Sequence, residues 1–255
     1  MASPEPPRRL VGVSTKMYFS LQQTFSYTWG LLQLDPLAFN ARIDLFLIPD
    51  FLSLHPCAAI LGPSHIKLGA QDTHWEDRGA YTGEVSPAAL AEVGVRIVEI
   101  GHAERRALFG ETDEVVARKA KAVSRHGMVP LVCVGETTHG SVASAAVGQA
   151  IQECRVQVEA VLRAVPEEQE IVFAYEPVWA IGAQEPADPD HVVHVTKAIR
   201  EMVGQRKGLV RIVYGGSAGP GTFGRIKDGV DGLFLGRFAH DIKNLEKVIK
   251  EMAEV

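Results

Sequence analysis

Short apolar runs alternate with longer amphipathic stretches along most of the 255-residue chain. Eight of these runs predict strands, at 10–14, 43–49, 66–70, 97–101, 129–134, 171–175, 211–214 and 232–236. Most of them are apolar throughout rather than alternating, which is typical of parallel strands covered by helices. The stretches between them predict helices at 113–126, 141–164, 190–207 and 244–252.

Strands that alternate with helices indicate a parallel sheet. Eight such units in about 250 residues fit one closed α/β barrel, (β/α)8. A doubly wound open sheet is the alternative, but it usually carries a G-x-G-x-x-G pattern after its first strand, where this chain has Lys16-Met17-Tyr18. No stretch rich in Pro, Gly or Ser divides the chain, so we expect one domain at 9–255 after a short disordered arm at 1–8.

Charge and cysteine content narrow the function classes. The chain has 26 basic and 31 acidic residues, a net charge of −5, with no long block of either sign. This argues against a nucleic-acid partner but leaves room for a local anion pocket. We expect no membrane contact, because the chain has no apolar run of about 18 residues and no apolar leader at its start. Three cysteines without CxxC spacing favour a reducing compartment.

Polar residues follow several of the predicted strands, where a barrel of this kind places its active site: Lys16, His102, Glu104 and Glu176. Apolar neighbours would raise the pKa of Glu176 and make it a better base; a structural carboxylate is the other interpretation. A helix start beside His102 would favour a neutral imidazole, which can donate a hydrogen bond to a carbonyl oxygen. Glu104 could equally form an ordinary surface ion-pair network with Arg105 and Arg106, and Lys16 could be an ordinary surface lysine.

Glycines follow the seventh and eighth predicted strands. Gly215-Gly216-Ser217 and Gly236 would let an anion approach free backbone amides, and the loops after these two strands are the usual phosphate site of the barrel. Tight turns, which use glycine for the same steric reason, are the alternative. Two such sequences in successive loops favour phosphate binding.

Five motifs, spread over most of the chain, resemble the triosephosphate isomerase family: 81–87 (YTGEVSP), 100–114 (IGHAERR with FGETDE), 133–136 (CVGE), 174–182 (AYEPVWAIG) and 214–217 (YGGS). The resemblance implies a TIM barrel that interconverts dihydroxyacetone phosphate and glyceraldehyde 3-phosphate through an enediolate, without a metal or organic cofactor. It also implies a cytoplasmic homodimer in which the loop carrying Thr82 inserts into the partner subunit.

The resemblance also implies roles for single residues. Glu176 would take the proton, His102 would polarise the carbonyl and move protons between oxygens, and Lys16 would stabilise the enediolate. Glu104 would be the carboxylate beside that lysine. The small phosphorylated sugar would bind its phosphate among Gly182, Gly215, Gly216, Ser217 and Gly236, under a lid at residues 177–187.

The chain departs from the family pattern at four places. Ser14 stands where the family usually has an asparagine that contacts the substrate oxygen. The lid tip reads Gln184-Glu185-Pro186 instead of a glycine-rich sequence, and Pro186 should stiffen it. Arg237 replaces the second glycine after the eighth strand, and its guanidinium would bind an anion or point to solvent. The third loop contains His74-Trp75.

These departures leave three hypotheses. The triose phosphate isomerase is the first. The second is an isomerase of a four-carbon ketose phosphate such as an erythrulose phosphate, because the third-loop His-Trp and the Gly-Arg after the eighth strand resemble that branch of the superfamily. The third, from another class, is a non-catalytic barrel that binds or senses a phosphorylated ligand.

Overall fold

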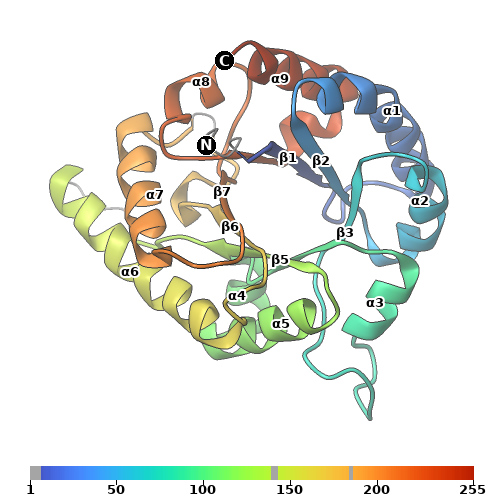
Figure 1. Cartoon of the computed structure of the whole chain (residues 1–255), viewed down its shortest axis with the longest axis horizontal. Helices are drawn as coiled ribbons and strands as arrows, with labels where there is room; N and C mark the ends of the chain where they lie inside the picture. Colours follow the sequence, from blue (N-terminus) through green and yellow to red (C-terminus); the bar gives the residue numbers. More distant parts are fainter. Residues whose placement is uncertain (1–6, 139–142, 184–185) are drawn as a thin grey trace, which may run out of the picture.

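Eight parallel strands close into one barrel in chain order (Figure 1). The computed structural model describes residues 7–138, 143–183 and 186–255. The strands are β1 (Arg9–Ser14), β2 (Ile43–Ile48), β3 (Lys67–Ala70), β4 (Ile97–Ile100), β5 (Val129–Val134), β6 (Ile171–Tyr175), β7 (Val210–Tyr214) and β8 (Gly232–Leu235). Each begins and ends within a residue of its predicted bounds, and the predicted barrel is confirmed.

The strands are apolar throughout because both of their faces are buried. Alternate side chains fill the barrel interior, among them Leu10, Phe46 and Ile97, while the others pack under the helices. Gly12 makes room for this filling, since a Cβ there would stand 1.8 Å from the Phe46 ring. The barrel interior is therefore a packed core.

Helices surround the barrel: α1 (Leu21–Asn40), α2 (Leu54–Leu61), α3 (Pro87–Val93), α4 (Ala103–Phe109), α5 (Asp113–Arg125), α6 (Ala143–Ala164), α7 (Pro189–Val203), α8 (Thr222–Ile226) and α9 (Ile242–Glu254). Short 3-10 turns follow β2, β6 and β8, at Phe51–Ser53, Val178–Ala180 and Arg237–His240. Side-chain caps start several helices, such as the Ser20–Gln23 capping box of α1.

The predicted helices need two corrections. The helix predicted at 190–207 ends at Val203, because Gly204 takes a left-handed φ of 61° that stops it. The helix predicted at 244–252 is longer at both ends and starts after the cap residue Asp241. Residues 141 and 142 of the helix predicted at 141–164 lie outside the described residues, as do residues 1–6 of the predicted arm.

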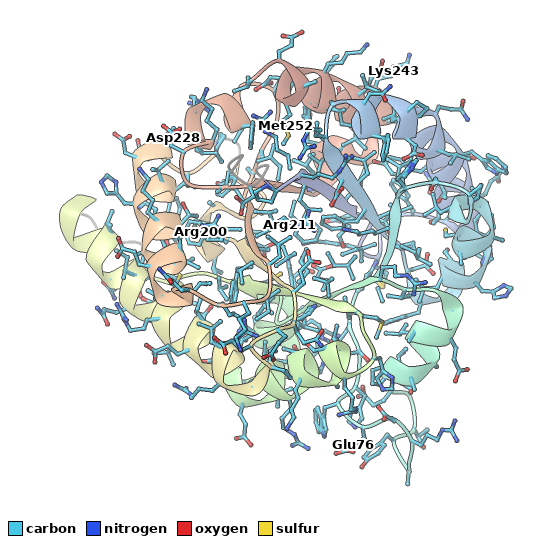
Figure 2. The ribbon with its side chains drawn as sticks, viewed as in Figure 1. Glu76, Arg200, Arg211, Asp228, Lys243 and Met252 are labelled. Atoms are coloured by element: carbon cyan, nitrogen blue, oxygen red, sulfur yellow. The ribbon has the colours of Figure 1, made fainter. Side chains whose placement is uncertain are left out.

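Charged residues close the amino end of the barrel. Arg211 of β7, labelled near the barrel axis in Figure 2, donates to Asp44 Oδ2 at 2.8 Å and to Glu170 Oε1 at 2.6 Å. Arg8 donates to Asp44 Oδ1 at 2.7 Å. These ion pairs tie four strand starts together and leave the carboxyl ends for chemistry. Across the described ranges, no helix is long and apolar enough to cross a membrane.

Candidate active site

One cavity of about 640 Å³ opens at the carboxyl ends of the strands. It brings together every residue that the sequence predicted for the substrate site: Ser14, Lys16, His102, Glu104, Glu176, Gly182, Gly215, Gly216, Ser217, Gly236 and Arg237. Thr82, predicted for the subunit contact, lies away from it on the exposed loop between β3 and α3. In Figure 1 this loop projects from the body of the barrel.

Lys16 has an unusual backbone that aims its side chain at the cavity. Its φ is +46°, a left-handed conformation that costs energy for a residue with a side chain. Gln71 stabilises it by donating to the Lys16 carbonyl at 2.8 Å. Lys16 Nζ donates to Glu104 Oε1 at 2.8 Å. Burial disfavours the charged amine, but Glu104, Glu176 and Glu99 outweigh it and raise the pKa of Lys16, which keeps its positive charge.

His102 is held as a neutral imidazole. It occupies the N-cap of α4, where its Nδ1 accepts a hydrogen bond from the Glu104 amide at 3.1 Å. The proton of the neutral ring is therefore on Nε2. Burial, helped by the charge of Lys16, lowers the pKa of His102 to about 4. The Nε2–H group lies 3.5 Å from Glu176 Oε2.

Glu176 follows β6 and is a buried carboxylate with a free oxygen. Its side chain is 4% exposed, and its Oε2 has no hydrogen-bond partner within the part of the chain that the structure describes. Burial and then the charge of Glu99 raise the pKa of Glu176 to about 8. A carboxylate that is weakly solvated and unpaired is a strong general base. Its place beside His102 Nε2 and the charged Lys16 suits proton abstraction next to a carbonyl.

In the loop after β7, Gly215 makes room for the base and Ser217 binds the lid. A Cβ at Gly215 would stand 2.4 Å from Glu176 Oε1, so only glycine fits against the carboxylate. The Gly215 amide donates to Tyr175 O at 2.9 Å. Ser217 donates from its amide to Ala180 O at 3.3 Å and from its hydroxyl to Ala183 O at 2.8 Å. In this structure the Ser217 amide is therefore bonded to the lid, and it would have to leave Ala180 to bind a phosphate.

The loop after β8, the strand next to β7 in the barrel, brings Gly236 and Arg237 to the cavity. A Cβ at Gly236 would meet nothing within 4 Å, which leaves its backbone open to a ligand. The Arg237 Nη2 atom comes within 3.2 Å of the position of a Cβ on Gly182, so the guanidinium lies beside the lid at the cavity and does not extend away from it. Gln184 and Glu185 of the lid tip lie outside the described residues. Arg225 also lines the cavity and was not predicted.

Two further site residues escaped the sequence analysis. Glu99 of β4 is 3% exposed and accepts a hydrogen bond from Ser14 Oγ at 3.0 Å. The buried Cys133 thiol of β5 and Glu176 influence each other's pKa. A carboxylate inside the apolar run 97–101 was a visible signal for Glu99, because an isolated charge in a buried strand needs a reason. Cys133 opens the 133–136 motif, but its residue type alone gave no signal of a site role, since it resembles any buried small residue.

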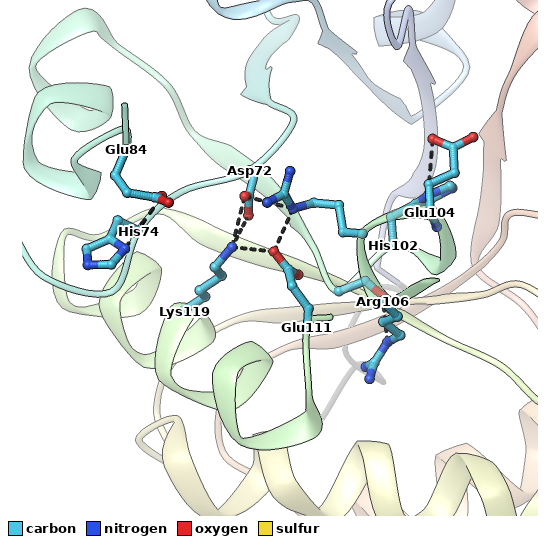
Figure 3. A network of polar contacts seen from close by, with 10 residues as sticks. Asp72, His74, Glu84, His102, Glu104, Arg106, Glu111 and Lys119 are labelled. Atoms are coloured by element: carbon cyan, nitrogen blue, oxygen red, sulfur yellow. Dashed lines mark hydrogen bonds and ion pairs between the residues drawn. The ribbon is translucent and has the colours of Figure 1, made fainter. Parts of the chain in front are cut away.

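A buried ionic cluster fixes the elements behind His102 (Figure 3). Lys119 Nζ of α5 donates to Asp72 Oδ1 at 2.7 Å and to Glu111 Oε1 at 2.5 Å. Arg105 Nε of α4 contacts Asp72 Oδ2 at 2.8 Å and Glu111 Oε1 at 2.5 Å. The cluster thus joins α4, α5 and the start of the loop after β3. Among the residues described, no three His, Cys, Asp or Glu side chains are placed to hold a metal ion.

Comparison with known protein families matches residues 9–252 to the family described as Triosephosphate isomerase. The chain is 45% identical over 251 residues to "L-erythrulose-1-phosphate isomerase" of Pectobacterium atrosepticum, covering 94% of each chain. It is 40% identical over 250 residues to the protein of the same name from Rhizobium etli, covering 95% of this chain and 92% of the relative. A "Triosephosphate isomerase" of Caldanaerobacter subterraneus is 38% identical over 226 residues, covering 85% and 90%.

The barrel and its cavity define an isomerase of phosphorylated sugars. The chain belongs to the triosephosphate isomerase family. The resemblance drawn from the five motifs is confirmed, and so is the expectation of an isomerase. The relatives favour the four-carbon alternative over the triose phosphates that the sequence analysis placed first.

Proposed function

We propose that this protein isomerises a four-carbon ketose phosphate, with L-erythrulose 1-phosphate as the substrate, through an enediolate. The observation that carries the chemistry is the convergence of Lys16, His102 and the unpaired Glu176 oxygen at one cavity. The names of the most similar relatives support the choice of substrate. An assignment to triose phosphates is the second candidate, supported by the relative that carries that name.

The two candidate substrates differ by one hydroxymethyl group. In dihydroxyacetone phosphate the carbonyl carbon lies between the phosphate-bearing carbon and a free CH2OH group. In erythrulose 1-phosphate one hydrogen of that CH2OH is replaced by CH2OH. Because the first carbon carries the phosphate, the acidic C–H next to both carbonyl and hydroxyl is on the third carbon. Its removal gives an enediolate, and proton return to the second carbon moves the carbonyl to the third.

The site has the groups that this reaction needs. Glu176 takes the proton from the third carbon and returns one to the second. His102 Nε2–H donates to the carbonyl oxygen, where negative charge develops, and the Lys16 ammonium stabilises the same charge. Ser14 is shorter than asparagine and leaves room at the edge of the cavity, beside which the extra hydroxymethyl would lie. The phosphate group of the substrate binds to Arg237, Gly236 and the glycines after β7.

The lid at residues 177–187 would protect the enediolate from water and from loss of phosphate. Two hydrogen bonds hold the described parts of this segment: the Ser217 hydroxyl donates to the Ala183 carbonyl, and the Tyr214 hydroxyl accepts from the Ala187 amide at 3.1 Å.

We also propose that the protein is a homodimer, in which the exposed loop with Thr82 contacts the partner subunit. The 9–255 segment is the catalytic domain in this proposal.

Proton exchange tests the proposed chemistry directly. Purified protein is incubated with L-erythrulose 1-phosphate in D2O and followed by proton NMR. We expect deuterium at the carbon that receives the proton, together with conversion to the isomeric ketose. Glu176→Gln should abolish both, with the protein still folded by circular dichroism.

Two results would contradict the proposal. Exchange with dihydroxyacetone phosphate and none with the four-carbon sugar would select the triose reaction. Saturable binding of either phosphate without exchange would favour the binding or sensing protein considered from the sequence.

A further inference from the structure

A second carboxylate lies inside the barrel beneath the proposed site. Glu99 is on β4, two residues after Ile97, and strand alternation puts both side chains on the interior face. The side chain is 3% exposed. Burial of a carboxylate costs free energy unless the group is paired or protonated. Its presence in an otherwise apolar strand therefore suggests a functional reason.

The hydrogen-bond partner of Glu99 in the structure is a residue of the cavity wall. Ser14 Oγ donates to Glu99 Oε2 at 3.0 Å, and Ser14 itself lines the cavity. The Ser14 carbonyl accepts from His240 Nε2 at 3.1 Å. Ser14 is therefore fixed through both its side chain and its backbone. The Ser14 hydroxyl occupies the position where the family usually has the longer side-chain amide of asparagine. Glu99 contacts this hydroxyl from the barrel interior.

Charged groups of several elements act on Glu99. Lys16, after β1, favours its ionised form, whereas Glu104 of α4 and Asp72, after β3, disfavour it. Burial is the largest influence and raises the pKa of Glu99 to about 7. Glu99 in turn acts on Glu176, after β6, and on the Cys133 thiol of β5. The two buried carboxyls, Glu99 and Glu176, thus titrate as neighbours over the same pH range.

We propose that Glu99 is a positioning residue for the isomerase reaction, which holds the Ser14 hydroxyl at the substrate cavity and acts on Glu176 through its charge. The inference rests on the proposed function and adds a residue to it. When Glu99 is ionised, it accepts the Ser14 hydrogen and strengthens Glu176 as a base. When Glu99 is protonated, it can donate to Ser14 Oγ, and the Ser14 hydrogen is then free to turn to a substrate oxygen.

Substitutions at Glu99, with a matched control, separate these effects. Glu99→Gln keeps a hydrogen-bonding group beside Ser14 but removes the charge. Glu99→Val removes both and is compatible with a buried strand. Glu170→Gln is the matched control, because it removes one carboxylate charge at the amino end of the barrel, beside Arg211. The pH profile of kcat/KM is measured for each variant and for the wild type with the four-carbon and the three-carbon substrate.

We expect the acid limb of the Glu99→Gln profile to move to lower pH by about one unit, the size of the effect of one neighbouring charge. Its KM should stay near the wild-type value. Glu99→Val should show the same shift and also a kcat reduced about tenfold, since an unanchored Ser14 costs roughly one hydrogen bond. Ser14→Ala should lower kcat by a similar factor without moving the limb, and adding Glu99→Val to it should lower kcat no further. The control profile should not move.

Infrared titration of the protonated carboxyl band gives a readout that does not need turnover. The Glu99→Gln and Glu176→Gln variants are each compared with the double variant, which supplies the baseline. We expect the band left in Glu99→Gln to titrate at lower pH than the corresponding wild-type band. An unchanged pH profile of kcat/KM together with an unchanged carboxyl band in Glu99→Gln would overturn the inference. Glu99 would then have only a structural role in the core. Absence of turnover by the wild type on both sugars would instead overturn the proposed function, and the infrared result would still decide the role of Glu99.

Discussion

At the scale of residues, the site obtains its chemistry from the surroundings of a few ordinary side chains. Glu176 is a base because it is buried and its outer oxygen is unpaired. His102 is neutral because the Glu104 amide occupies Nδ1 and burial penalises the charged ring. Lys16 stays charged because carboxylates surround it. The contact that orients His102 lies within α4, whereas Lys16 and Glu176 are influenced by residues of other strands and loops.

The buried base should reduce stability as the pH rises. The pKa of Glu176 is about 8 in the folded protein, against 4.5 for a free side chain, so the native state keeps a proton that the unfolded chain releases between these values. The free energy of unfolding therefore falls with pH across this window. The Glu176→Gln side chain cannot ionise. The free energy of unfolding of this variant, relative to that of the wild type, should therefore be about 2–4 kcal/mol higher at pH 8 than at pH 4. Urea unfolding at both pH values measures this.

The exposed Glu201→Gln is the control and should show no such gain. An equal stability difference at pH 4 and pH 8 for Glu176→Gln would mean that Glu176 titrates normally.

The position of the Glu176 carboxylate depends on the space that Gly215 leaves beside it. A Cβ at Gly215 would come within 2.4 Å of Glu176 Oε1 and displace the carboxylate. Because a misplacement of about 1 Å costs on the order of 100-fold in rate, Gly215→Ala should lower kcat by about that factor. Steady-state kinetics checks it, with Gly224→Ala as a control, since a Cβ there contacts only Glu251 at 4.0 Å. A kcat within twofold of the wild type would show that the base tolerates the shift.

At the scale of elements, the site depends on helices that the sequence pattern did not reveal. The eight strands could be predicted to within a residue, because continuous apolar runs are an unambiguous pattern. Helices α1 to α4 and α8 were not predicted: α1 contains Pro36, and α4 and α8 are too short for a clear period. The catalytic residues at the strand ends could be found from their motifs. The Ser14–Glu99 contact could not, because 85 residues separate its partners.

The ionic cluster should be the main anchor of α4. Lys119 is 3% exposed, and its loss would leave the carboxylates of Asp72 and Glu111 with only Arg105 to neutralise them. Lys119→Met should therefore destabilise the protein by about 3 kcal/mol. Chemical denaturation measures the loss, and the exposed Lys121→Met should change stability by less than about 0.5 kcal/mol. A loss for Lys119→Met no larger than that of the control would show that the cluster does not hold α4.

At the scale of the whole molecule, the loop between β3 and α3 is the feature that the barrel itself does not explain. It projects from the body in Figure 1, and Tyr81 on it is 42% exposed. An exposed aromatic residue on a projecting loop is typical of a contact surface. Internal contacts order this loop. The His74 amide donates to Val85 O at 2.8 Å, and the His74 Nδ1 atom lies 3.5 Å from Glu84 Oε2.

The proposed homodimer predicts that a charge at the tip of this loop disrupts assembly. Light scattering after size exclusion should give twice the chain mass for the wild type and the mass of one chain for Thr82→Arg. Gln205→Arg, exposed after α7, adds the same charge elsewhere and should remain a dimer. A dimeric Thr82→Arg variant would place the subunit contact on another surface.

The central claim is that the site takes a four-carbon ketose phosphate, and the ratio of kcat/KM for L-erythrulose 1-phosphate to that for dihydroxyacetone phosphate tests it most directly. The additional hydroxymethyl should be bound in the space beside Ser14, so we expect a ratio of at least about ten, the value of one modest additional interaction. Equal values, or a preference for dihydroxyacetone phosphate, would contradict the claim and assign the protein to the triose reaction.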